Sequence, residues 1–511
     1  MVNPLNNISA TPAPAPTRAA NSAAPADITI SYNSQDEVVF GASPITVPNV
    51  TNKSGKLSVE KAELNEKLKA NSDGTFVYES KNEPAYTGAL TFAATAKTIN
   101  AFSDAIGQPL KWAFSGDKLK INPDAGEDFN AYYSRDEASV NFFHGTDPKT
   151  SQVLYSGNSG EVVSHEVGHA MLDAIRPGYF ESWTPDAGAF HEAFGDMMGM
   201  MMAFKDDRAV KQAAQQTGGD LTKQNCIAAT GEQLGIGIND YVGQNATGGD
   251  YVRNAINSFK WVDPNTLPSN APNDQLSSEV HSFSRLWSGA FYDIVAGVQA
   301  RNMAAGMDAE TALKATGDEM LKVLANGMKD APQGDFTFRD MANAWVAADQ
   351  KYNNGADADL MTKVFTDRGI LGGTTPAPAP APPSGGDGGN SGSTSRLSGI
   401  TSYTSEGQKP LSDLTRTVYT RLSGPEFGMF QGAQVESVVD KDGSLTKDAE
   451  VGSRVKQNLA RYIADGRIRY NDPSYKMKVP QDLFDAKGRP YIGFVRWDNG
   501  QMVIERAKVA N

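Results

Sequence analysis

Hydrophobic and polar positions divide the chain into a strand-patterned part followed by a helix-patterned part. Between residues 27 and 83, the runs DITISYN, EVVFG and GTFVYES are rich in β-branched and aromatic residues, which predicts short strands. A helical pattern follows near 86–106, and further strand-like runs precede residue 160. From about 160 to 371 the pattern is mainly helical. This order predicts an α+β protein with a strand-rich N-lobe at 27–160 and a helical lobe at 161–371.

Two segments of biased composition mark the borders of this unit. Residues 1–26 are rich in Ala, Pro, Asn and Thr with few large apolar groups, which predicts a disordered tail. Residues 374–395 join a Pro-Ala run to a Gly-Ser run and are typical of an interdomain linker. The remaining 396–511 has a helical pattern near 447–464 and a hairpin signal around Asn499-Gly500. We therefore expect a small tethered α+β domain at the C-terminus.

Composition narrows the function classes. The 511 residues exceed what one core usually serves, and the net charge of −13 argues against nucleic-acid binding. Residues 396–511 carry an excess of basic over acidic residues, so this domain either is ordinary solvated surface or binds a surface or partner. No run approaches the roughly 18 apolar residues of a membrane span. Cys226 is the single cysteine, which excludes an intrachain disulfide.

The segment EVVSHEVGHAMLDAIRPG carries the chemistry. It predicts a helix from about 161 to 175, ended by a Pro-Gly pair. His165 and His169 are four residues apart and share one helix face, so both imidazoles can reach one zinc ion. Glu166 is placed to accept a proton from a water that the metal activates. The alternative is a pair of structural core histidines.

A second apolar helix, AGAFHEAFGDMMGMMMAFK, carries Glu192 and Asp196 on one face. Two carboxylates on a Met- and Phe-rich helix are costly to bury without partners. We therefore expect Glu192 to be the third metal ligand and Asp196 to accept the outer N–H of a ligating histidine, His165. The alternative is that both are surface groups. His191 is expected to point elsewhere, as a core or rim group.

His165-Glu166-x-x-His169, with Glu192 23 residues further on, resembles the gluzincin clan and specifically the thermolysin-like peptidases. The resemblance covers roughly 85–371. It implies a two-lobed catalytic unit with a central zinc helix, and a zinc-dependent endopeptidase that acts on protein or peptide substrates. Asn130 and Ala131 resemble the start of the edge strand that pairs with substrate in this family.

The same resemblance assigns further residues. His281 is similar to the histidine that stabilises the tetrahedral intermediate, and Arg253 to the arginine that holds the substrate carbonyl. Tyr179 is similar in placement to the tyrosine that assists the oxyanion. Where the family has an Asp five residues before its histidine, this chain has Leu276, and Glu279 and Asp274 are both candidates to replace it.

Three further expectations concern the whole chain. The resemblance indicates a secreted or extracellular enzyme, although no signal peptide is recognisable in the sequence. Calcium is left open as an additional ion: the Asp-x-Asp-Gly sequence at 440–443 is either part of a calcium-binding loop or an ordinary Asp-Gly turn. The competing function is a catalytically silent, zinc-stabilised protein for binding or surface attachment.

Overall fold

The computed structural model describes residues 24–372, except 79–83, 136, 183, 243–246 and 269–270. Beyond residue 372 it describes five strands, at 419–420, 426–428, 468–470, 493–498 and 501–505. The predicted tail at 1–26 lies almost wholly outside the described residues. The linker at 374–395, the helix near 447–464 and the Asp-x-Asp-Gly turn lie outside them entirely.

An eight-stranded sheet forms the first lobe, in the order β1-β2-β3-β4-β5-β7-β6-β13. Neighbours are antiparallel except β4 with β5 and β5 with β7, which are parallel. The strands in that order are Ala26–Tyr32, Ser43–Lys53, Lys56–Ser58, Ala62–Leu64, Leu119–Asn122, Ser139–Phe142, Ala131–Ser134 and Glu426–Gly428. The last of them comes from the C-terminal part of the chain.

Three smaller sheets complete the strands that the structure describes. They are β8–β9 (His144–Thr146 and Val153–Tyr155), β10–β11 (Ala229–Thr230 and Arg253–Asn254), and β12-β16-β15-β14 (Tyr419–Thr420, Gln501–Glu505, Gly493–Asp498 and Ile468–Tyr470). In the last sheet Asp498 pairs with Gln501, which agrees with the hairpin predicted around Asn499-Gly500.

Two predicted strands are wrong. EVVFG forms a turn, because the N–H groups of Val39 and Phe40 both donate back to Asp36 O rather than to a neighbouring strand. GTFVYES contributes one bridge, Ile30 to Phe76. The long strand β2 was not predicted, because Pro44 and Pro48 interrupt its pattern. The β1–β2 register shifts between Ala26 and Ile28, opposite the segment that contains Pro48.

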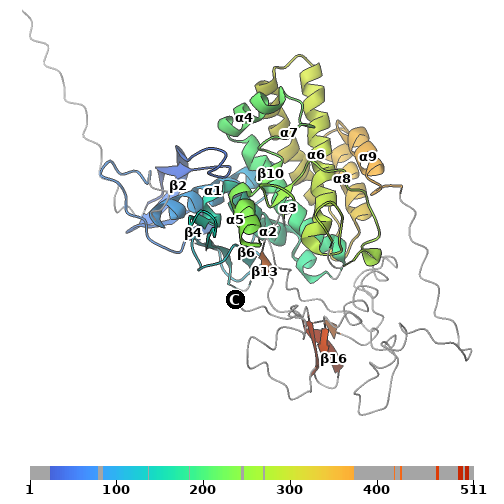
Figure 1. The fold of residues 1–511 in the computed structure, drawn as a ribbon, viewed down its shortest axis with the longest axis horizontal. Helices are drawn as coiled ribbons and strands as arrows, with labels where there is room; N and C mark the ends of the chain where they lie inside the picture. The colour runs from blue at the N-terminus through green and yellow to red at the C-terminus, as the bar shows by residue number, and fades with distance from the viewer. Residues whose placement is uncertain are drawn as a thin grey trace, which may run out of the picture.

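The helices are α1 (Pro84–Ile106), α2 (Gly160–Ile175), α3 (Pro185–Phe204), α4 (Asp207–Thr217), α5 (Glu232–Val242), α6 (Val280–Ala304), α7 (Ala309–Lys329), α8 (Phe338–Tyr352) and α9 (Ala358–Asp367), with short 3-10 turns at Ser156–Asn158, Pro177–Glu181 and Pro264–Thr266. Figure 1 shows the strand-rich part on one side and the later helices on the other, with α2 between them. The predicted α+β class, with a strand-rich first part and a helical second part, is confirmed.

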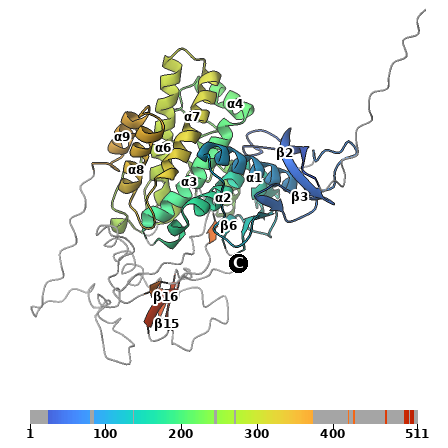
Figure 2. The same cartoon turned by 180° about the vertical axis from the view of Figure 1, so that it is seen from behind.

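Helix α2 is the centre of the packing. It contacts α1, α3 and β6, and its first fourteen residues are all buried. Gly168 on α2 faces Gly195 on α3, where a Cβ on Gly168 would lie 3.1 Å from Gly195 Cα. The absence of side chains at this crossing lets the two helices approach closely. Figure 2 shows α2 and α3 together behind α1.

The N-terminal segment is built into this unit. Gly160 N, at the start of α2, donates to Gln35 O at 3.1 Å, and Ser34 Oγ donates to Asp206 at 2.8 Å. A Cβ on Gly160 would lie 2.0 Å from Asn33 O, so only glycine fits there. Among the described helices, none is long and apolar enough to be a candidate membrane span. The domain boundaries drawn from the sequence remain a prediction.

Candidate active site

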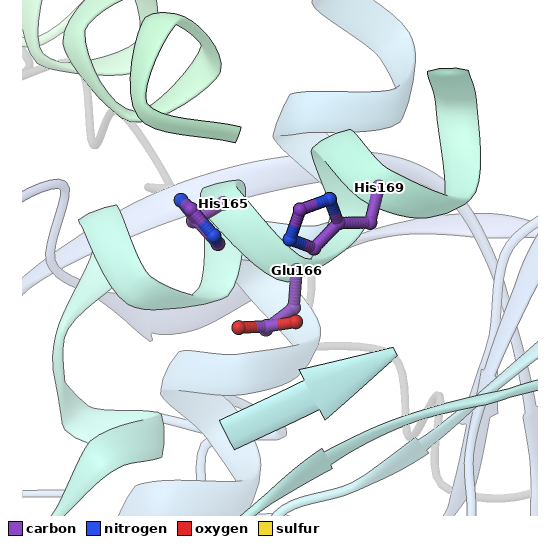
Figure 3. Close-up of side chains that lie close together, drawn as sticks. All are labelled: His165, Glu166 and His169. Carbon is purple, nitrogen blue, oxygen red and sulfur yellow. The ribbon is translucent and has the colours of Figure 1, made fainter. Parts of the chain in front are cut away.

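Helix α2 carries five titratable side chains within its buried length, and three of them lie close together. Its first turn is capped by Ser159, whose side chain accepts from Val162 N. His165, Glu166 and His169 are each 0% exposed, and their potential ligand atoms lie within 4.8 Å of one another (Figure 3). Among the described residues, these three form a group that could hold a metal ion.

Glu192, on the neighbouring helix α3, adds a carboxylate to the two imidazoles. Its Oε2 lies 3.4 Å from His165 Nε2, and its Oε1 lies 3.6 Å from His169 Nε2. Ligand atoms around a tetrahedral zinc ion are about 3.3 Å apart when the bonds are roughly 2.0–2.1 Å, so these separations fit one shared ion. The four carboxylate oxygens of Glu166 and Glu192 are buried without a hydrogen-bond partner among the described residues. A cation would offset the cost of burying them.

Asp196 and Arg253 position the imidazole of His165 on its Nδ1 side. Asp196 Oδ1 lies 3.0 Å from His165 Nδ1, and Arg253 donates to the same carboxylate over 2.7 to 3.0 Å. Burial alone would raise the pKa of Asp196, but the charge of Arg253 and the bond from His165 lower it to about 2. An ionised Asp196 accepts the Nδ1 proton of His165 and leaves its Nε2 facing Glu192.

His281 approaches the same carboxylate from the start of α6. Its Nε2 lies 3.4 Å from Glu192 Oε2, and its Nδ1 lies 2.5 Å from Glu279 Oε1. Of the two candidates to replace the family Asp, Glu279 is therefore the one in contact. Although burial lowers the pKa of His281, the charges of Glu192 and Glu279 raise it to about 9. The imidazolium form is favoured at neutral pH.

His191 is a site residue that sequence reasoning missed. Its Nδ1 lies 3.0 Å from His169 Nδ1, and its ring is fully buried, 4.3 Å from the Phe180 ring centre. His191 was expected to be a core or rim group. It is buried in the core, but it faces a proposed metal ligand. The only available signal was its position beside Glu192, which does not reveal how two helices pack.

Residues 140–374 match the family model of the fungalysin metallopeptidases (M36). This part of the chain is similar to the fungalysin metallopeptidases. The fungalysin match confirms the resemblance to thermolysin-like zinc metallopeptidases, and the protein is a metalloendopeptidase. Among solved structures the chain is similar to a precursor of protealysin, a metalloproteinase from Serratia proteamaculans, with 18% identity over 58% of this chain and 80% of that chain and a TM-score of 0.34. No curated protein matches the chain.

Strand β6 packs beside helix α2. Ala131 opens the strand and is buried, and Asn130 directly before it is 3% exposed. Tyr133 OH donates to Asp173 on α2 at 2.8 Å, which fixes the strand to that helix. The two residues predicted to bind substrate, Asn130 and Ala131, therefore lie at the start of a strand that packs on α2.

Tyr179 is placed differently from the expectation. Its hydroxyl donates to Pro332 O at 2.8 Å, its ring packs 4.5 Å from the ring centre of Phe336, and the residue is 1% exposed. A buried phenol whose proton already goes to a main-chain carbonyl has no proton left for an oxyanion. The expected role of Tyr179 is therefore withdrawn. Its neighbour Phe180 packs against His191, so the 3-10 turn directs a phenyl ring there and not a hydroxyl.

Proposed function

We propose that this protein cleaves peptide bonds with zinc held by His165, His169 and Glu192, and with Glu166 as the proton carrier. The observation that supports this most is the convergence at Glu192. Both imidazole Nε2 atoms face its carboxylate at 3.4 and 3.6 Å in a fully buried setting. Glu166 lies on the same helix, with both oxygens unpartnered among the described residues.

Bound zinc supplies a Lewis acid for the scissile carbonyl and makes a water easier to deprotonate. Glu166 then accepts the proton of the attacking water and delivers it to the departing amine. Burial raises the pKa of Glu166 to about 8, which suits a group that must both take and release a proton near neutral pH.

The surrounding residues position charge and substrate. The His281 imidazolium faces the site and stabilises negative charge on the carbonyl oxygen. Arg253 donates to Asp196 and thereby positions His165. We further propose that Arg253 donates a hydrogen bond directly to the substrate carbonyl. Asn130 and Ala131 hold the backbone of an extended substrate along the edge of β6.

A substitution at Glu166 tests the assigned chemistry. We expect Glu166→Gln to keep bound zinc while kcat/KM for an internally quenched peptide falls by about 10²–10⁴-fold, because the amide cannot accept the proton. Zinc content is measured by atomic absorption and turnover by fluorescence. Glu310→Gln, an exposed change on α7, is the matched control and should behave like the parent protein.

Glu192→Gln separates ligation from catalysis. It should weaken zinc binding by more than the roughly 10–100-fold typical of an outer-sphere change. If Glu192→Gln kept full zinc affinity, the ligand assignment would be wrong. If the parent protein bound zinc and hydrolysed no peptide or protein, the silent scaffold predicted as the alternative would be the better account.

The proposal also includes the predicted location of the enzyme and the predicted role of its C-terminal residues. We infer that the enzyme acts outside the cell and that residues 396–511 bind a surface or partner. For calcium no site is assigned, since the group on α2 contains two histidines and calcium prefers oxygen ligands. Adding calcium during thermal unfolding would test that ion directly: an unchanged Tm would remove it from the proposal.

A further inference from the structure

Strand β6 carries a strand from the other end of the chain on its outer edge. On its inner side β6 pairs with β7, from Ala131 opposite Phe142 to Ser134 opposite Ser139. On its outer side it pairs antiparallel with β13, which places Glu426, Phe427 and Gly428 opposite Ser134, Tyr133 and Tyr132. Strand β13 is therefore added to the sheet by main-chain pairing.

The added strand lies next to the catalytic helix. Strand β13 contacts α2 as well as β6, and α2 carries His165, Glu166 and His169. Figure 1 shows β13 below α2 and beside β6, on the side toward the small sheet that contains β16. Strand β13, from the C-terminal part of the chain, thus contacts the catalytic unit beside the proposed metal ligands.

An edge strand has one set of unpaired N–H and C=O groups, and an extended peptide binds by using that set. In the proposed function a substrate lies along the edge that starts at Asn130 and Ala131. Residues Tyr132 to Ser134 continue the same edge, and β13 pairs with these three. A substrate long enough to extend past Ala131 cannot form those bonds while β13 holds them.

Charge favours this contact. Residues 396–511 have 18 Lys and Arg against 14 Asp and Glu, whereas the first 395 residues are strongly acidic and give the chain its net charge of −13. A basic segment tethered to an acidic body is attracted to it. Tethering also keeps the segment at a high effective concentration, so three paired residues compete with a free peptide.

We propose that residues 426–428 are an internal competitor of substrate, which covers the edge of β6 in the intact chain and must leave before a long peptide binds. This inference rests on the proposed function. It makes residues 396–511 a regulator of the peptidase whose release, by cleavage of the linker or by binding of the domain elsewhere, opens the edge.

Proline variants of the full chain test the competitor. Paired residues alternate between hydrogen-bonded and non-hydrogen-bonded positions, so one of Glu426→Pro and Phe427→Pro removes a ladder donor. At least one variant should lower KM for an eight-residue quenched peptide, by about tenfold if the closed form holds about nine molecules in ten, with kcat unchanged. A dipeptide that does not extend past Ala131 should keep its KM. Ser393→Pro in the linker is the control.

The outcomes separate the inference from the proposed function. If parent and variants all cleave the long peptide with one KM, the competitor is wrong and the peptidase stands. If none cleaves it although zinc is bound, the proposed function fails first. Mass spectrometry adds a third outcome: cleavage of the chain between residues 424 and 430 by its own active site would make this segment a substrate and overturn the inference.

Discussion

Each imidazole of the proposed metal site is oriented through its Nδ1 atom. His165 Nδ1 faces Asp196, and His169 Nδ1 faces His191, both at 3.0 Å. A neutral imidazole has one donor and one acceptor nitrogen, so a proton on Nδ1 leaves Nε2 as the ligand. Burial holds the pKa of both His169 and His191 well below the ordinary value, which keeps this pair neutral. His191 must then accept from His169.

Replacing His191 should affect the metal before it affects the fold. We expect His191→Leu to weaken zinc binding by about 10–100-fold, because His169 loses the acceptor for its Nδ1 proton. His191→Asn supplies a side-chain carbonyl and should restore most of the affinity. Competition with a chromogenic chelator measures both, and equal affinities in Leu and Asn variants would show that His191 only fills space.

The sequence predicts how two site residues lie relative to each other when both are on the same helix. The spacing of His165 and His169 determines that they share a face, and the same holds for Glu192 and Asp196. The contact between His169 and His191 depends instead on how α2 and α3 cross, which spacing within one helix does not contain. Tyr179 failed for a related reason: the turn after α2 decides whether residue 179 or 180 faces the site.

The crossing of α2 and α3 brings the proposed ligands of two helices together. Gly195 lies between Glu192 and Asp196, and its Cα faces the His165 ring so closely that a Cβ there would lie 2.5 Å from Nδ1. The ring is also held by Asp196 and cannot move away without losing that bond. A methyl group at this position must displace either the imidazole or the helix.

Gly195→Ala should therefore disturb the site although alanine is the better helix former. We expect zinc affinity to fall by at least about tenfold, as for loss of an outer-sphere partner, despite retained helical circular dichroism. Gly41→Ala is the control, since a Cβ there meets nothing within 4 Å. Parental zinc affinity in Gly195→Ala would mean that the two helices adjust freely at their crossing.

The sequence predicts where an element begins and ends when its hydrophobic periodicity extends over many residues. The predicted zinc helix at about 161–175 is observed at Gly160–Ile175, whereas the short run EVVFG became a turn. Five residues are too few for their pattern to distinguish a strand from a turn. The carbonyl of Asp36 accepts the hydrogen bonds that form the turn. The carboxylate of Asp36 is itself held by Gln233 N, far along the chain.

Across the whole molecule, three acidic side chains from distant segments meet near the start of α2. Asp36 Oδ2 accepts from Gln233 N at 3.0 Å, and Glu161 Oε2 accepts from Gly231 N at 2.8 Å, next to Glu232. Burial raises the pKa of Asp36 to about 6 and, with the charge of Asp36, that of Glu232 to about 8. Burial and the charge of Glu232 also hold the pKa of Glu161 well above its ordinary value.

These raised pKa values predict that stability falls as pH rises. Between the ordinary carboxyl pKa and the folded value, the folded state binds more protons than the unfolded state, so the free energy of unfolding decreases with pH. The window is about pH 4 to 6 for Asp36 and about pH 4.5 to 8 for Glu232. We expect Glu232→Gln to flatten the decline of Tm between pH 5 and 8. An identical Tm profile in parent and variant would contradict this.

The bracing of α2 by the loop at residues 33–36 has a consequence for synthesis of the enzyme. Ser34 bonds to a residue 172 positions later, and Asp36 to one 197 positions later, while the proposed site also needs His281. A growing polypeptide that has left the ribosome only as far as α3 already holds both histidines of α2 and the Gln35–Gly160 bond, but it holds neither the partners of Ser34 and Asp36 nor His281. Such a precursor cannot assemble the complete site, so its own cell is exposed to an active protease only after translation has passed α6.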